Sequence, residues 1–322
     1  MGMSTVLAVL LALAAAPGRT FESLPVPDSL ADIGKGSVRL EEKTRTRREW
    51  GALFEGLSSM KEHAEFLKQH PVLIRLEDET KLGGALAGIT PEGILINRQE
   101  VERMRAQLVK QGVAEDKADK ILQLKLLPVI AHEVRHAINC EEIFKRTGRR
   151  YFFPTKEDEI SALDDGARVL RELQSSDDPD VRLAYSPGLR NRVDNEIYKE
   201  LEQAAAGGRA GLKQLVDKRY KGTPAVLELS DDYLVKAYGA WAEEGRKKLS
   251  MAALTRQQLL MATSATETQQ MQAVLAKLGS EGRIAQEVKA AEEAMEFFKD
   301  PERGRKMREY YQERLKSVGQ PS

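Results

Sequence analysis

Cysteine is almost absent from this chain, since Cys140 is the only one in 322 residues. An internal disulfide needs two cysteines, so the small disulfide-stabilised extracellular folds are excluded. Aromatic residues are also scarce, at 6% of the chain, and 50 acidic residues balance the 50 basic ones. Surfaces that bind nucleic acid are basic and often carry aromatic rings on which bases stack. The composition therefore argues against a nucleic-acid partner.

The apolar run at the N-terminus, from Val6 to Ala16, is too short to cross a membrane. Its length suits the apolar core of a signal peptide, and Ala14 to Ala16 supply small residues that favour cleavage. We therefore predict a signal peptide over residues 1–20 and a linker over residues 21–40. The mature protein is expected to be exported (periplasmic, cell-envelope or secreted) and to lack a transmembrane segment.

One small sheet is expected between residues 70 and 100. Ala85–Thr90 and Ile94–Asn97 are largely apolar, and the turn residues Pro91-Glu92-Gly93 separate them, which predicts an antiparallel hairpin. Val72–Leu76 is another short β-branched run. The rest of the chain has helical periodicity, so the predicted fold class is α+β and mainly α.

Two predicted helices are bounded by recognisable start and end signals. Pro128 is favoured in a first helical turn and Gly148 at a helix end, so together they bound one of them. Thr155-Lys156-Glu157-Asp158 resembles a capping box and predicts the start of the other, which runs to about Leu173. The remaining expected helices span residues 41–69, 100–110, 115–126, 194–206, 225–249, 255–278 and 284–299.

The motif His132-Glu133-Val134-Arg135-His136 is the part of the chain that indicates chemistry. Residues four apart lie on the same face of a helix, so His132 and His136 can reach one zinc ion. Glu133 is rotated by roughly 100° from His132, close enough to act on a water at the metal without being a ligand. Zinc lowers the pKa of such a water, and a neighbouring carboxylate can take the released proton. We therefore predict a zinc site with Glu133 as general base.

A catalytic zinc site usually has a third protein ligand. The chain has only four histidines, and the other two, His63 and His70, fall in a charged predicted helix, where we expect them at the surface. Cys140 shares a helix face with His136, but we interpret it as a small buried hydrophobic residue. The third ligand is therefore expected to be a carboxylate downstream of the motif.

Glu157 and Glu159 compete for that role. The two are about 200° apart around a helix, so only one can face the metal. Glu159 shares its face with the apolar or small residues Ala162, Leu163, Gly166 and Leu170, which could pack against the motif helix. Glu157 shares its face with Ser161, Asp164 and Arg168, which we expect to face solvent, and is explained by the helix start, where the dipole favours acids. We predict Glu159 as the ligand, with Glu157 as its rival.

Together, the motif at 132–136 and Glu159-Ile160-Ser161-Ala162 resemble the gluzincins, a group of zinc peptidases that includes the thermolysin-like enzymes. The resemblance implies Zn²⁺ as cofactor, a peptide or protein substrate, and a catalytic domain over residues 41–175 followed by a helical region over 176–322. It also implies that an edge strand upstream of the motif binds the substrate main chain, and Gly93–Asn97 stands in that position. Leu163 occupies the place where thermolysin-like enzymes have an aspartate, so the residue that supports a zinc histidine is unassigned.

Two other interpretations stay open. The protein could be an exported helical scaffold that binds a partner and carries a non-catalytic metal site. It could instead be a helical cell-envelope protein with no metal, in which case the motif is accidental. Glu133 favours the enzyme, because a purely structural metal site has no use for a general base.

Overall fold

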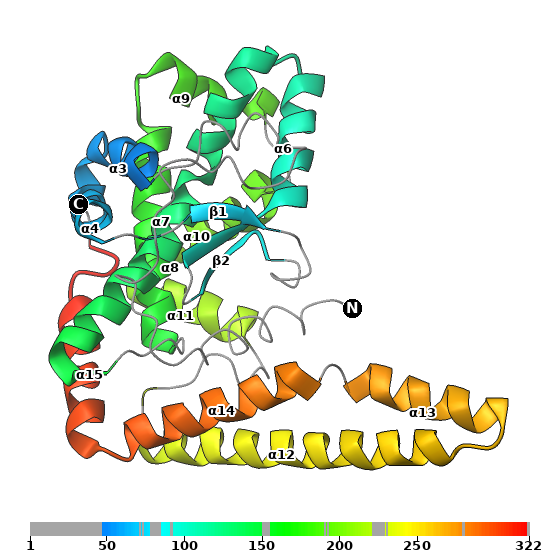
Figure 1. Ribbon diagram of the computed structural model, residues 1–322. Coiled ribbons are helices and arrows are strands. Elements are labelled where there is room, and N and C mark those ends of the chain that lie inside the picture. The colour runs from blue at the N-terminus through cyan, green and yellow to red at the C-terminus, as the bar shows by residue number, and fades with distance from the viewer. Residues whose placement is uncertain are drawn as a thin grey trace.

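The computed structural model describes residues 47–70, 72, 74–77, 85–90, 93–149, 155–189, 191, 193–220, 229, 231–278 and 281–320. The predicted signal peptide and linker lie outside these residues. Within them the chain is mainly helical with one small sheet, which confirms the predicted fold class (Figure 1). The helices are α3 (Arg47–Glu55), α4 (Lys61–Gln69), α6 (Arg98–Lys110), α7 (Glu115–Thr147), α8 (Lys156–Gln174), α9 (Pro179–Ala184), α10 (Lys199–Ala206), α11 (Gly208–Arg219), α12 (Asp231–Met261), α13 (Ala265–Leu278), α14 (Glu281–Phe298) and α15 (Pro301–Arg314).

The sheet contains three strands in the order β1-β3-β2: β1 (Ile74–Glu77), β2 (Ala87–Thr90) and β3 (Gly93–Asn97). Strands β2 and β3 form the predicted antiparallel hairpin, with Gly88 opposite Leu95. Strand β1 pairs with β3 in parallel, so the sheet is mixed, whereas an antiparallel sheet was expected. All five residues of β3 are buried, as a central strand requires.

Helix α7 runs unbroken through Pro128, whereas the sequence analysis placed a helix start there. Proline has no N–H, so it leaves the carbonyl four residues earlier, that of Leu124, without its helical partner. The Tyr185 hydroxyl donates to the Leu124 oxygen at 2.9 Å, and the Tyr198 hydroxyl donates to the oxygen of Lys125. Tyr185 therefore replaces the bond that the proline removes, Tyr198 adds a bond to the next carbonyl, and the helix continues.

The single helix expected over residues 41–69 is divided in two. A 3-10 turn over Ser58–Met60 separates α3 from α4. The amides at this break are satisfied from α8, because the Glu172 carboxylate accepts from the backbone N–H groups of Ser58 and Ser59, at 2.5 and 3.0 Å. A long-range contact, which local periodicity does not reveal, thus fixes the break.

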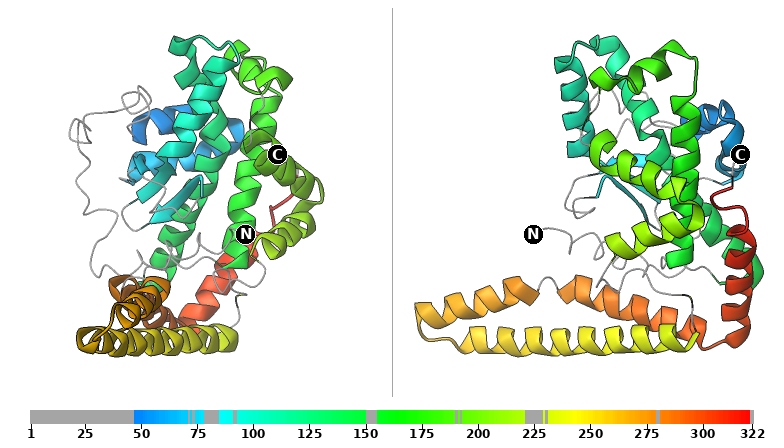
Figure 2. Two further views of the ribbon diagram at one scale, coloured as in Figure 1. Left: turned by 90° about the vertical axis from the view of Figure 1, so that its right-hand side faces the viewer. Right: turned by 180° about the vertical axis from the view of Figure 1, so that it is seen from behind.

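Helices α12, α13 and α14 form an arm that projects from the body of the molecule (Figure 2). The helix predicted over residues 255–278 is interrupted here by a turn between α12 and α13. Ser264 and Glu267 form a reciprocal capping box at this point, since each side chain accepts from the other's backbone N–H at 3.2 Å. The Ser-x-x-Glu pattern was present in the sequence and could have located the turn.

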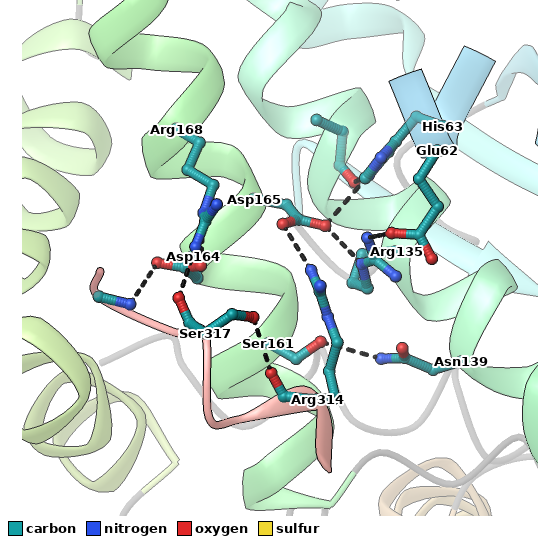
Figure 3. Close-up of polar contacts among 12 residues, drawn as sticks. Glu62, His63, Arg135, Asn139, Ser161, Asp164, Asp165, Arg168, Arg314 and Ser317 are labelled. Atoms are coloured by element: carbon teal, nitrogen blue, oxygen red, sulfur yellow. Dashed lines mark hydrogen bonds and ion pairs between the residues drawn. The ribbon is translucent and has the colours of Figure 1, made fainter. Parts of the chain in front are cut away.

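A buried group of charged residues joins α4, α7, α8 and α15 (Figure 3). Asp165 of α8 pairs with Arg135 of α7, and it accepts from Arg314 of α15 at 2.8 Å. Arg135 also pairs with Glu62 of α4. Burial would raise the pKa of Asp165, but Arg135 first, then His63 and Arg314, lower it to about 2. The carboxylate is therefore charged and holds these elements together at neutral pH.

His63 belongs to this buried group, so the expectation that it lies at the surface was wrong. Its side chain is 1% exposed, and its Nε2 lies 3.1 Å from the Ala131 carbonyl oxygen and 3.3 Å from Asp165. Nε2 therefore carries the proton, while the buried Nδ1 has no hydrogen-bond partner among the described residues. Burial lowers the pKa of His63 to about 4, although Asp165 opposes this shift. The ring is neutral in the fold.

The stability of the fold should consequently fall on acidification between pH 6.5 and pH 4. In this window the unfolded chain binds a proton at His63 that the folded chain does not bind. The contribution of His63 to the free energy of unfolding is therefore complete above about pH 6.5 and is lost towards pH 4. A shift of this size corresponds to about 3 kcal/mol of unfolding free energy. Urea denaturation in the presence of a chelator, repeated across this pH range, measures the unfolding free energy.

The control is His63→Gln, which keeps a donor for the Ala131 carbonyl but cannot titrate. The wild-type unfolding free energy should fall by more than that of His63→Gln across this window. Equal pH dependence in the two proteins would contradict the assignment of a neutral, buried His63.

No helix among the described residues is long and apolar enough to cross a membrane.

Candidate metal centre

Three side chains from α7 and α8 converge with their ligand atoms facing one another. The Nε2 atoms of His132 and His136 lie 3.0 Å apart. Glu159 lies 3.7 Å from the first nitrogen through Oε2 and 3.8 Å from the second through Oε1. The carboxylate is 3% exposed, as its position beneath the two rings requires. The two histidines of one helix and a glutamate of the next thus form a single cluster, with all ligand atoms within 4.8 Å of one another.

The geometry of this cluster fits a small tetrahedral cation. Zinc bonds of 2.0–2.1 Å place neighbouring ligand atoms about 3.3 Å apart, and the separations within the cluster lie on both sides of that value. Burial lowers the pKa of His132, with His136 adding to the effect. Burial would also lower that of His136, but Asp158, Glu159 and Glu133 raise it to about 10. His136 Nε2 therefore donates a hydrogen bond to His132 Nε2. A divalent cation bound by both rings would take the place of this shared proton.

Close packing of α8 on α7 brings Glu159 to the histidines. The stripe predicted to pack there is buried along its length: Ala162, Leu163, Gly166 and Leu170. At Gly166 the helices approach so closely that a Cβ atom would lie 3.0 Å from the Pro128 carbonyl oxygen and 3.8 Å from the His132 Cβ. Glycine at this position therefore allows the contact that places Glu159 two turns earlier on the same face.

Glu159, and not Glu157, faces the histidines, as predicted. The reasoning about the opposite face was wrong in one respect, however. Ser161 and Asp164 were expected to be solvent-facing but are fully or almost fully buried, at 0% and 1% exposure. The chain's C-terminal segment contacts Asp164, which accepts from the Gly319 N–H at 3.1 Å, and Ser161 accepts from Asn139 of α7 at 3.2 Å. Cys140 is buried, as expected.

Each histidine is also held through a second contact on its ring. His136 Nδ1 lies 2.7 Å from Asp158 Oδ2, and His132 hydrogen-bonds the backbone carbonyl of Ala162. A carboxylate behind a metal-binding histidine orients the ring and increases its basicity. The sequence analysis missed Asp158, which it had assigned to the helix start. Thr155 is the residue that caps the helix, because its Oγ1 accepts from the Asp158 N–H at 3.2 Å, whereas the Asp158 side chain supports His136.

Glu133 lies beside the cluster without belonging to it. The side chain is buried and accepts a hydrogen bond from the Ile89 backbone N–H. Burial raises the pKa of Glu133 to about 7, with Glu159 and Asp158 adding to the rise and His136 opposing it. A carboxyl group whose pKa is raised towards neutrality suits a general acid or base.

Strand β2 is the edge strand beside this site, whereas the resemblance had pointed to Gly93–Asn97. That segment is β3, the central strand. Asn97 N–H donates to the Leu86 oxygen, and antiparallel pairing alternates inward and outward backbone groups. The backbone groups of Ala87 and Ile89 therefore point to the free edge of the sheet, where Ile89 meets Glu133.

A cavity of about 130 Å³ adjoins His132 and Glu133. Its lining is mainly apolar, with Arg219 as the charged member: Leu86, Ala87, Pro128, Val129, Leu163, Gly166, Ile197, Tyr198, Leu201 and Arg219. Tyr220, the next residue, hydrogen-bonds Glu159 through its side chain. Both residues come from the end of α11, a helix that the sequence analysis did not predict.

Comparison with known proteins finds no matching family model, no matching curated protein and no matching solved structure.

The two glutamates of α8 give a direct test of the metal centre. Glu159→Ala should abolish stoichiometric zinc binding, because it removes a ligand atom, whereas Glu157→Ala should retain about one zinc per chain. Glu157 lies in the first helical turn, so its loss should cost only a few tenths to about 1 kcal/mol of stability. Zinc content is measured by elemental analysis after dialysis. Retention of full zinc by Glu159→Ala would show that this carboxylate is not a ligand.

Proposed function

We propose that this protein is a zinc-dependent peptidase of the gluzincin type, with His132, His136 and Glu159 as metal ligands and Glu133 as general base. The observation that carries the proposal is the position of Glu133. It is a buried carboxylate beside a cluster of three ligand atoms, and it is not itself a member of the cluster. A site that only stored a metal or held the fold together would not need, beside its ligands, a carboxylate that is not a ligand.

The chain's own residues suit the deprotonation of a water molecule. Glu133 takes the proton and can later return it to the leaving amine, as a general base that becomes a general acid. Ile89 N–H keeps the carboxylate turned towards the edge of the sheet. A bound zinc ion would supply Lewis-acid chemistry, lowering the pKa of water and polarising the carbonyl under attack.

Substrate binding is assigned to the free edge of β2. An extended peptide can add to a sheet edge through main-chain hydrogen bonds. The outward N–H and C=O of Ala87 and the C=O of Ile89 offer such bonds next to Glu133, which already binds the Ile89 N–H. The apolar cavity beside His132 would take a side chain adjacent to the scissile bond. Tyr220 hydrogen-bonds Glu159, and its hydroxyl is the candidate for assisting the negative oxygen that develops during attack.

The decisive variant for the enzyme is Glu133→Gln. It keeps the size of the side chain but removes the base, so zinc content and folding should be retained while peptide cleavage falls by about 10²–10⁴-fold. Cleavage is measured on a broad peptide library, with and without a chelator. The matched control is Glu142→Gln on the same helix, where Glu142 pairs with Lys145; its activity should equal that of the wild type. Unchanged turnover in Glu133→Gln would reject the proposed role of Glu133.

A second candidate function is supported by the outer half of the arm. In α13 none of the residues whose burial is described is buried, and Met251, Leu254, Leu260 and Met261 of α12 are all at least 49% exposed. Such a surface suits a scaffold that binds a partner protein and carries a metal without catalysis. The Glu133→Gln comparison separates the two functions, because a scaffold would bind zinc and cleave nothing in either form.

Export completes the proposal. It rests on the apolar run from Val6 to Ala16, whose length suits a signal peptide.

A further inference from the structure

Asp158 connects the metal cluster to the last helix of the chain. Its Oδ2 accepts from His136 Nδ1. Its Oδ1 accepts from Asn139 Nδ2 at 2.6 Å and from the Tyr311 hydroxyl at 3.0 Å. The two oxygens of one buried carboxylate are thus shared between a candidate metal ligand on one side and helix α15 on the other.

Tyr310 makes a parallel contact one step farther from the cluster. Its hydroxyl donates to Asn139 Oδ1 at 2.6 Å, and the Asn139 side chain is fully buried. Adjacent tyrosines of α15 therefore hold Asp158 in two ways: Tyr311 bonds it directly, and Tyr310 bonds Asn139, which itself bonds Asp158.

These hydroxyls are not needed to dock α15. The helix is already attached by the buried Met307, by Arg314 on Asp165 at 2.8 Å, and by Glu313 on Arg146 at 2.8 Å. Phenylalanine would fill the same apolar space without burying a polar group, and an unmatched buried hydroxyl is costly. The presence of tyrosine at 310 and 311 is explained by the polar groups that they meet, Asn139 and Asp158.

We propose that Tyr311 is a positioning residue of the metal centre, which fixes Asp158 and thereby the ring of His136, and that Tyr310 supports it through Asn139. The inference rests on the metal role proposed above for His132, His136 and Glu159. It makes the centre a product of three parts of the chain: the motif helix α7, the glutamate helix α8, and the C-terminal helix α15. Without its hydroxyl partner, Asp158 keeps only the Asn139 amide as a donor to Oδ1 among these contacts, and its carboxylate is freer to rotate away from His136.

Loss of a partner behind a metal-binding histidine typically weakens metal affinity by about 10–100-fold. Asp158 is that partner of His136, and Tyr311 acts on it, so Tyr311→Phe in the full-length chain should weaken zinc binding by about 10-fold, the lower end of this range. Tyr310→Phe should have a smaller effect, because it acts through one more hydrogen bond. Tyr238→Phe is the matched control: it makes the same chemical change at a buried tyrosine of α12, in the same apolar cluster as Tyr310 and Tyr311, and should leave zinc affinity unchanged.

Zinc affinity is measured with Zn²⁺ alone by competition with a chromophoric chelator, and the thermal midpoint of the chelator-treated protein is measured in parallel. The positioning role predicts weaker zinc binding with a nearly unchanged midpoint. The visible spectrum of the Co²⁺-substituted protein should also change in Tyr311→Phe, because the orientation of a ligand ring changes. A lowered midpoint with zinc affinity within about twofold of the wild type would reduce Tyr311 to a structural residue and overturn the inference.

A double-mutant cycle with Asp158→Asn tests the route of the effect. If Tyr311 acts through Asp158, then Tyr311→Phe should cause little further loss of zinc affinity in the Asp158→Asn background. Full, additive losses would contradict that route. The failure of the proposed function is separate: it appears as a wild-type chain that binds no zinc, whereas failure of this inference appears as a zinc-binding chain that is indifferent to Tyr311→Phe.

Discussion

Helices α7 and α8 approach so closely at Gly166 that a Cβ atom there would lie 3.0 Å from the carbonyl oxygen of Pro128. This contact sets the depth at which α8 sits on the motif helix, and therefore the distance from Glu159 to the two histidines. A side chain at 166 would push the helices apart by a few tenths of an ångström or more, which is large compared with the tolerance of a metal site. The candidate metal centre thus depends on a steric condition seven residues from its third ligand.

The same pair of helices carries much of the buried charge of the body. Arg135, inside the motif, pairs with Asp165 on α8, while His136 pairs with Asp158 on the same helix. Removing one partner of a buried ion pair leaves the other charge uncompensated. These pairs therefore hold α7 and α8 together. Helix α15 joins both pairs, through Arg314 to Asp165 and through Tyr311 to Asp158. The buried contacts that pack α7, α8 and α15 together therefore also orient the histidines of the candidate metal centre.

Local sequence signals predicted the cluster of His132, His136 and Glu159 because much of its geometry is local. The spacing of His132 and His136 fixes their common face, and the apolar stripe beside Glu159 fixes the side of α8 that packs inward. The hairpin was predicted for the same reason, from a turn between two apolar runs. Long-range contacts account for what was missed: Glu172 breaks the first helix, Tyr185 keeps α7 continuous through Pro128, and His63 is buried by Asp165.

The supporting residues of the site were missed for a related reason. Asp158 has a sufficient local explanation as a helix-start acid, and its contact with His136 exists only once α8 is packed on α7. Tyr220 and Tyr311 come from α11 and α15, two helices that the sequence analysis did not predict. One signal for α15 was available, because Asp300 followed by Pro301 is a typical helix start, and the Asp300 side chain does accept from the Glu302 N–H at 3.0 Å.

X-ray absorption at the zinc edge, recorded on the zinc-loaded full-length chain, tests the metal centre most directly. The predicted spectrum contains two imidazole nitrogens and carboxylate oxygen at about 2.0–2.2 Å, with no sulfur neighbour. The imidazole contribution should disappear in the His132→Ala/His136→Ala double variant. A sulfur neighbour at about 2.3 Å, which would implicate Cys140, or a zinc environment without imidazole in the wild type, would contradict the assignment of His132, His136 and Glu159.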